Sequence, residues 1–195
     1  MEGRPEIAVV TARILTGLGL KTILEKIIPA ASIEVFGDVA EIDPAEAGRY
    51  FHFFVSSQLF VRHSAFFRPF RQRTILLTEG TAQPQFAGMH RLDVSAGEEQ
   101  LTRDILRMHR GAHGAEHGAP SPADIRSEVL SARETEVLTL IAQGLLNKQI
   151  AQRLGIGLTT VISHRRKLME KLGIRSVSGL TIYAVTMGYV DPDEI

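Results

Sequence analysis

The fold of the C-terminal third is decided by residues 131–190, SARETEVLTLIAQGLLNKQIAQRLGIGLTTVISHRRKLMEKLGIRSVSGLTIYAVTMGYV. Ser131 and Glu134 have the spacing of a capping box, in which the hydroxyl and the carboxylate each accept an N–H group of the first helical turn. Gly144 is expected to end this first helix. Its apolar residues recur on one helical face: Val137, Leu140 and Ile141.

Two further helices follow at short separation. The second helix is expected to end at Gly155, and its inner face is apolar: Ile150, Ala151 and Leu154. A link of three residues, 156–158, leads to a third helix over about 159–172, which Gly173 closes. Two short helices joined by a glycine-containing link are typical of a helix-turn-helix.

The third helix combines an apolar stripe with a polar, basic surface. The stripe is formed by Val161, Leu168 and Leu172, with Ile162 nearby. Residues 145–175 carry seven basic side chains against Glu170 alone, a net charge of six: Lys148, Arg153, Arg165, Arg166, Lys167, Lys171 and Arg175. A merely solvated charge run is the alternative, but charge, helix order and link length together favour a helix that enters the major groove of DNA.

Phosphate contacts would supply most of the affinity for double-stranded DNA, and base contacts the choice of sequence. Asn147 and Lys148 are expected to touch phosphates at the start of the second helix. His164 has two interpretations, since it could instead pack or cap within the domain. The remaining contacts are expected on the third helix: Thr159, Thr160, Ser163, His164, Arg165, Arg166, Lys167 and Lys171.

The same residues resemble the C-terminal domain of the LuxR/NarL group of bacterial transcription factors. Four pieces match in order and spacing: LSARETEVLTLIAQG, NKQIAQRLGI, TTVISHRRKLMEKLGI and TIYAVTMGYV. The resemblance implies a four-helix domain in which the helix from Thr159 reads DNA and the last helix, 177–187, forms a homodimer. Its expected contacts are the apolar side chains Ile182, Val185 and Met187, taken as exposed.

Three residues depart from the pattern of that group. The group often has Lys where this chain has Ile162, and often Asn where it has Lys167, so its base preference cannot be copied from relatives. Leu146 stands where a Ser or Thr commonly caps the second helix, which makes Asn147 the expected cap.

Residues 1–110 alternate strand and helix patterns. Strands are expected at 7–11, 32–36, 51–55, 74–78 and 90–94, and helices at 14–28 and 97–109, with a candidate helix after Pro44. Alternation of this kind predicts βαβ units and a five-stranded parallel sheet in a flavodoxin-like α/β domain. The α/β domain followed by a helical DNA-binding domain resembles a two-component response regulator.

The chemistry of a phosphorylatable receiver domain is absent from the matching positions. Such a domain needs carboxylates after the first strand to hold Mg²⁺, an Asp ending the third strand and a Lys ending the fifth. Here the first strand runs into Thr11-Ala12-Arg13, the third ends in Ser56-Ser57, and the fifth contains Asp93. Thr78 does end the fourth strand. The sequence therefore predicts a pseudo-receiver that is controlled by something other than aspartyl phosphorylation.

Residues 59–78 contain no acidic side chain and interleave arginines with phenylalanines. The arginines are candidates for an anionic small ligand such as a nucleotide: Arg62, Arg68, Arg71 and Arg73. A solvated rim around a phenylalanine core is the favoured interpretation, and docking against a partner is a third.

The rest of the chain limits the remaining classes of function. Residues 111–127 are rich in Gly, Ala and Pro and predict a flexible linker between residues 1–110 and the DNA-binding domain 128–195. The chain has no cysteine, no signal-peptide core and no apolar run of membrane-spanning length, so a cytoplasmic protein is expected. Neither a metal nor a cofactor is expected.

No pattern supports catalysis. Ser56, Ser57 and His63 lack nucleophile-elbow glycines, and no phosphate-binding glycine loop is present. The sequence thus predicts a dimeric transcription regulator that binds double-stranded DNA, with RNA polymerase as a candidate partner. The alternative is a protein-interaction adaptor or an anionic-ligand sensor in which DNA binding is secondary.

Overall fold

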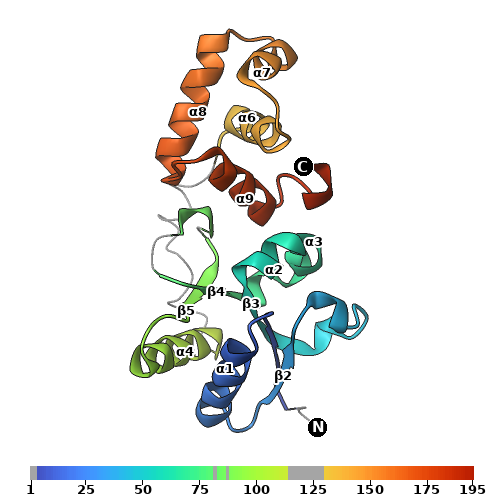
Figure 1. The fold of residues 1–195 in the computed structure, drawn as a ribbon, viewed down its shortest axis with the longest axis vertical. Helices are drawn as coiled ribbons and strands as arrows, with labels where there is room; N and C mark the ends of the chain where they lie inside the picture. The colour runs from blue at the N-terminus through green and yellow to red at the C-terminus, as the bar shows by residue number, and fades with distance from the viewer. Residues whose placement is uncertain (1–3, 81–82, 87, 114–129) are drawn as a thin grey trace. The chain divides into compact units, whose positions relative to one another are not determined.

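The computed structural model describes residues 4–80, 83–86, 88–113 and 130–195 (Figure 1). The chain divides into two compact units. Of the described residues, the first unit contains 4–80 and 89–113, and the second contains 83–86, 88 and 130–195. In the part of the chain that the structure describes, no helix has the length and apolar character needed to cross a bilayer.

The first unit is a parallel α/β sheet. Its strands are β1 (Glu6–Val10), β2 (Ser32–Phe36), β3 (Tyr50–Ser56), β4 (Thr74–Thr78) and β5 (His90–Asp93). They pair in the order β2-β1-β3-β4-β5, and every pair is parallel. The helices are α1 (Ile14–Ile27), α2 (Ser57–Arg62), α3 (Ser64–Phe67) and α4 (Glu98–His113). The five-stranded, flavodoxin-like sheet predicted from the sequence is confirmed.

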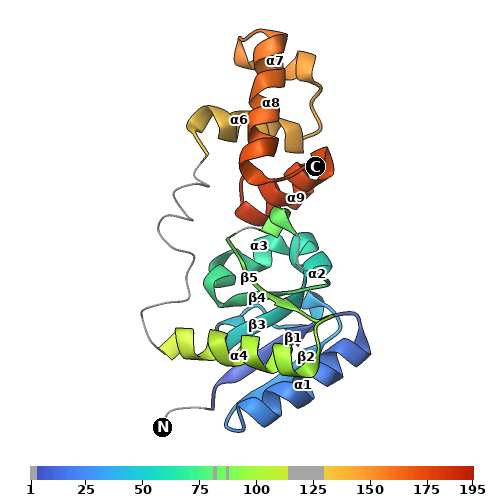
Figure 2. The same ribbon diagram turned by 90° about the vertical axis from the view of Figure 1, so that its left-hand side faces the viewer.

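Helices cover both faces of this sheet (Figure 2). Alternation along each strand sends residues such as Val9 and Phe54 to the face of α1 and α4, where Leu24 and Ile105 complete the core. On the other face Phe53 packs against aromatic rings from the segment after β3, which are Phe66, Phe67 and Phe70. The central strands β1, β3 and β4 are largely apolar because both faces of the sheet are covered there, whereas the edge strands β2 and β5 are more exposed.

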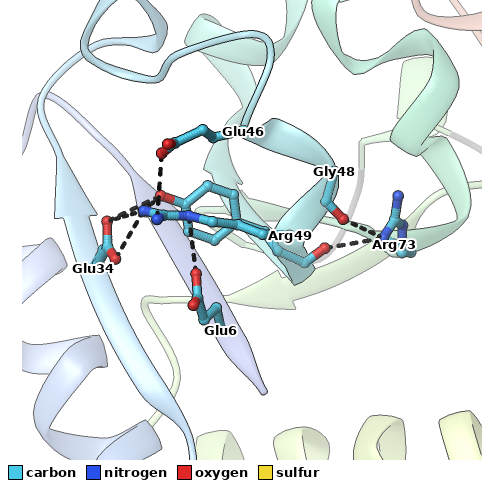
Figure 3. Close-up of polar contacts among 7 residues, drawn as sticks. Glu6, Glu34, Glu46, Gly48, Arg49 and Arg73 are labelled. Carbon is cyan, nitrogen blue, oxygen red and sulfur yellow. Dashed lines mark hydrogen bonds and ion pairs between the residues drawn. The ribbon is translucent and has the colours of Figure 1, made fainter. Parts of the chain in front are cut away.

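The connection from β2 to β3 contains no α-helix. It forms only two short 3-10 turns, η1 (Val39–Glu41) and η2 (Ala47–Arg49), so the candidate helix after Pro44 does not form. Arg49 ends η2 in a cluster of charged partners (Figure 3). Its guanidinium lies 2.9 Å from Glu6 on β1, 3.0 Å from Glu34 on β2 and 3.3 Å from Glu46. These ion pairs tie the connection to two strands in place of helix packing.

Tyr50 links this cluster to the core. Its ring is 2% exposed, and its hydroxyl donates to Glu34 Oε2 at 2.9 Å and accepts from Arg49 at 2.8 Å. Burial raises the pKa of the Tyr50 hydroxyl, so the group stays neutral. The cluster thus links Glu6 and Tyr50, at the amino-terminal ends of β1 and β3, to Glu34 in the middle of β2.

Helix α1 leaves one side uncovered. Leu20 and Leu24 face the sheet, whereas Ile14, Leu15 and Leu18 are half to four-fifths exposed. This side of α1 is an exposed apolar patch, formed by Ile14, Leu15 and Leu18.

Helix α4 continues to His113, which is farther than the predicted end near 109 and overlaps the start of the predicted linker. The remainder of that linker, 114–127, lies outside the described residues.

The second unit is helical. It contains α6 (Ala132–Ala142), α7 (Asn147–Leu154), α8 (Leu158–Leu172) and α9 (Val177–Met187), together with the 3-10 turns η4 (Pro84–Phe86) and η5 (Pro192–Glu194). Its core joins side chains of all four helices: Leu138, Ile150, Val161, Leu168, Leu180 and Tyr183.

The structure confirms the predicted start of α6 and the predicted ends of α7 and α8. The Ser131–Glu134 capping box is present, with N–H to oxygen distances of 3.2 and 2.8 Å. Gly155 and Gly173 end α7 and α8 with φ of +63° and +65°, the left-handed conformation that glycine adopts without strain.

Candidate nucleic-acid interface

Helix α8 presents a polar and basic surface. Val161, Leu168 and Leu172 are buried on one side of the helix. Most of the remaining surface is exposed, and it carries six residues that were predicted to contact DNA. Lys171 is one of them and is described below, and the other five are Thr159, Thr160, Ser163, Arg166 and Lys167. The structure therefore brings these five onto the outer side of one helix.

Arg165 and His164 lie closer to the core than their neighbours, and both are half-buried. The Arg165 guanidinium donates a hydrogen bond of 2.5 Å to the side-chain oxygen of Asn147. This hydrogen bond joins α8 to the first turn of α7. Both residues were predicted to contact DNA, so each side chain helps to orient the other.

The expectation that Asn147 caps α7 is wrong. Leu146 is the N-cap residue, and its N–H group donates to Gln149 Oε1 at 2.8 Å. A capping box has two side-chain hydrogen bonds, and the leucine side chain has no polar atom to make one of them. Only the bond to Gln149 is therefore formed here. Asn147 is left to accept from Arg165, and Lys148 follows it on the exposed first turn.

Lys171 turns back toward α6. Its ammonium group lies 2.9 Å from Glu134 Oε2, the same carboxylate that caps α6. The backbone N–H of Ser131, and after it the Lys171 ammonium, lower the pKa of the Glu134 carboxyl. Lys171 therefore differs from Arg166 and Lys167. Its contact with DNA stays a prediction, and a phosphate would have to compete with Glu134 for the Lys171 ammonium group.

Ile162, which the sequence placed near the apolar stripe of α8, lies outside that stripe. It is 49% exposed, since it lies about 100° around the helix from buried Val161. Leu158, one turn earlier, is 47% exposed, and Leu146 before α7 is 69% exposed. Helical spacing from Val161 could have placed Ile162 on the outside, but its apolar character favoured the core.

The residues predicted to dimerise on α9 differ in accessibility. Ile182 and Met187 are half-buried, and Met187 packs against the core. Val185 is 3% exposed, so the expectation of an exposed side chain is wrong for this residue. Helix α9 is apolar around most of its circumference, and η4 of the same unit contacts it in addition to α6. Dimerisation through α9 stays a prediction.

The four arginines predicted as an anion site differ in their surroundings, and their role as such a site stays a prediction. Arg73 donates to the carbonyl oxygens of Gly48 and Tyr50, at 3.5 and 3.1 Å (Figure 3). Its guanidinium also lies over the Phe70 ring. Arg71 points its Nε at the Met89 sulfur, 3.2 Å away. Arg62 and Arg68 are exposed. At least two of the four thus hold the fold. Of the phenylalanines in this segment, Phe60 and Phe67 are core residues, and Phe66 and Phe70 are half-buried.

Side chains at the carboxyl ends of β1, β4 and β5 contact groups on neighbouring strand ends. Arg13, after β1, forms an ion pair with Glu79, after β4. The Thr78 hydroxyl donates to the Leu92 carbonyl at 3.4 Å. Asp93 accepts from Gly80 N–H and from Ser95, whose hydroxyl bond chiefly lowers the pKa of this carboxyl.

Part of the chain is similar to known regulatory proteins. Residues 128–184 match the family described as bacterial regulatory proteins, luxR family. The transcriptional regulatory protein MctR of Rhizobium johnstonii is 45% identical over 64 residues, which cover 33% of this chain and 30% of MctR. The C4-dicarboxylate transport transcriptional regulatory protein DctR of Rhodobacter capsulatus is 47% identical over 83 residues, which cover 39% and 42%. The match spans less than half the length of either relative.

Solved structures resemble the chain over nearly its whole length. A complex of the two-component response regulator RcsB with DNA has a TM-score of 0.57 at 18% identity and covers 94% of this chain and 98% of that chain. RcsB from Salmonella enterica serovar Typhimurium, bound to a promoter in the presence of BeF3⁻, has a TM-score of 0.64 at 16% identity, with 94% and 99% covered. This likeness supports the fold, a receiver-like α/β unit with a helical helix-turn-helix unit.

Proposed function

We propose that this chain, whose residues 128–184 form a DNA-binding domain of the luxR family of bacterial regulatory proteins, is a sequence-specific transcription regulator that acts as a dimer in the cytoplasm. The observation that carries the proposal is the outer side of α8, where Arg166 and Lys167 are exposed beside Thr159, Thr160 and Ser163. Cations bind phosphates, and the shorter polar groups suit base edges in the major groove.

The charge distribution supports DNA as the partner. The chain as a whole is neutral, yet residues 145–175 carry a net charge of six. Lys171 and Arg165 are engaged within the unit, which leaves the exposed cations of α8 and the start of α7 to meet phosphates. Each phosphate contact releases counterions, so affinity should fall steeply with salt.

We further propose that the first unit is a pseudo-receiver. The strand ends carry Arg13, Ser56 and Asp93 where a phosphorylatable receiver would carry a carboxylate, an aspartate and a lysine. The Arg13–Glu79 ion pair and the engaged Thr78 hydroxyl support a role without acyl-phosphate chemistry. Control of DNA binding would then rest on another signal.

The first experiment is genome-wide recovery of bound DNA with the full-length protein and with the double variant Arg166→Ala/Lys167→Ala. Discrete sites are expected for the wild type and are expected to be lost in the variant. Arg103→Ala/Arg107→Ala, on exposed positions of α4, removes the same charge from the other unit and should keep the sites. Arg165 is less suitable, because its loss would also release Asn147.

Diffuse recovery from both proteins would contradict the proposal and favour the adaptor. The pseudo-receiver is tested separately, by adding Mg²⁺ and BeF3⁻ to the full-length protein on a recovered site. Unchanged affinity and an unchanged oligomeric state are expected. A gain in affinity would contradict control without phosphorylation, whereas the proposal that the protein binds DNA would still stand.

A further inference from the structure

The part of α8 that carries the DNA-facing groups also exposes aliphatic side chains. Leu158 and Ile162 lie four residues apart, so their side chains adjoin on one side of the helix, and each is about half exposed. Arg166 lies a further four residues along the same side. An apolar strip of Leu158 and Ile162 thus continues directly into a guanidinium.

The helical domain itself does not account for the position of this strip. Val161, Leu168 and Leu172 supply the core contacts of α8, and the core cluster of the domain contains neither Leu158 nor Ile162. Single exposed aliphatic residues are common on protein surfaces. This pair, however, occupies the amino-terminal half of a recognition helix, the half that reaches base edges in helix-turn-helix complexes.

The chemistry of the major groove identifies what an isoleucine can bind there. Base edges present hydrogen-bond donors and acceptors, and an aliphatic group cannot pair with these. They also present the 5-methyl group of thymine, against which an aliphatic group can pack. The neighbouring cations Arg166 and Lys167 would hold the helix against the phosphates on either side. An aliphatic side chain in this position therefore selects for a methyl group in the groove.

We propose that Ile162 is a specificity-determining residue that reads the 5-methyl group of a thymine in each half-site, with Leu158 extending the apolar contact. The inference rests on the proposed function, because it assumes that the exposed side of α8 enters the major groove. It assigns to Ile162 a preference that a lysine at this position, which would seek a phosphate or guanine oxygen, could not provide.

The test removes the methyl group alone. A preferred site is first selected in vitro with the full-length wild-type protein, and each thymine is then replaced in turn by deoxyuridine. In each half-site, one thymine position should respond: a single replacement there should weaken wild-type binding about fourfold, which is the effect of losing one buried methyl group. Ile162→Ala should bind the thymine and uracil forms of that position equally well.

Two control variants sharpen the comparison. Ile162→Lys should also lose the thymine preference, and the slope of its log affinity against log salt should become steeper by about one. Leu15→Ala removes an 82% exposed leucine from α1 and should keep the full thymine preference. Circular dichroism of each variant checks that the exposed substitutions leave the fold intact.

The outcomes separate the inference from the function on which it rests. Wild-type protein that binds the selected site equally with thymine or uracil at every position overturns the role of Ile162 and leaves the regulator intact. A thymine preference that persists undiminished in Ile162→Ala does the same. Failure to select any sequence would overturn the proposed function, and the inference with it.

Discussion

The Arg165 guanidinium and the Asn147 side-chain oxygen are joined by a hydrogen bond of 2.5 Å between helix α8 and the first residue of α7. Both residues were predicted to touch DNA. Their contact means that each orients the other, and that the two should act as one unit when DNA binds.

This pairing can be tested with a double-mutant cycle. Asn147→Ala and Arg165→Ala should each weaken binding to a selected site, and the double variant should be little worse than Arg165→Ala. A coupling energy on the order of 1 kcal/mol is expected for a hydrogen bond to a charged group that is half-buried. Fluorescence anisotropy of labelled DNA measures it.

The matched control for this cycle is Arg166→Ala with Asn147→Ala. Arg166 is exposed, and its effect should add to that of Asn147 within about 0.5 kcal/mol. Additivity of Arg165 with Asn147 would contradict the orienting role.

Dimerisation through α9 is best tested at Ile182, which is half-buried and lies outside the core cluster. Ile182→Glu should yield a monomer in sedimentation experiments. It should weaken binding to a two-half-site operator about a hundredfold, because linked binding of the two domains is lost. Leu15→Glu on α1 is the control, and a dimeric Ile182→Glu protein would place the interface elsewhere.

The stability of the helical unit should depend on pH through Glu134. Its carboxyl has a lowered pKa in the folded state, so its ion pair and capping bond stabilise the fold above the unfolded value of about 4.5. That contribution is lost as pH falls through the folded-state pKa. Urea unfolding should therefore show a loss of stability below about pH 5.

Glu134→Gln separates the charge from the shape of the cap. Glutamine still reaches the Ser131 N–H, but it does not titrate, so the acid-dependent loss should shrink. Glu136→Gln on the same helix, 53% exposed beside Arg133, is the control and should retain it. Equal pH dependence in wild type and Glu134→Gln would show that other groups govern acid unfolding.

The charged cluster around Arg49 predicts that Tyr50→Phe lowers the stability of the first unit. The substitution removes a buried hydroxyl that bonds Glu34 and Arg49 and should cost about 1 kcal/mol. Calorimetry should show the transition of the α/β unit shifted down by about 4 to 8 °C. Tyr189→Phe in the helical unit is the control and should leave this transition unchanged. If Tyr50→Phe did not shift the transition temperature, the ion pairs would hold the connection without the hydroxyl.

Features that depend on neighbouring residues were the most predictable from sequence. The buried strands are apolar runs, and the structure places each within about two residues of the predicted bounds. The Ser131–Glu134 box and the terminal glycines of α7 and α8 depend on spacing alone, and they too appear where expected.

Features that depend on distant residues were not predictable in the same way. Arg49 is held by Glu6 and Glu34, which are brought to it only by the parallel pairing of the strands. Asn147 fails as a cap because Gln149 bonds the preceding N–H, while Arg165 occupies the asparagine oxygen. In both cases the deciding partner arrives through the tertiary fold.

The exposed apolar patch of α1 has a consequence for colloidal behaviour. The chain has a formal net charge of zero and a sequence pI of about 7.1, so repulsion between molecules is weakest near neutral pH. Near that pH, little electrostatic repulsion keeps two molecules apart. They can then associate through the exposed apolar patch, which is formed by Ile14, Leu15 and Leu18. The purified protein should be least soluble near pH 7, and Leu15→Lys should raise its solubility there, as light scattering at increasing concentration would record.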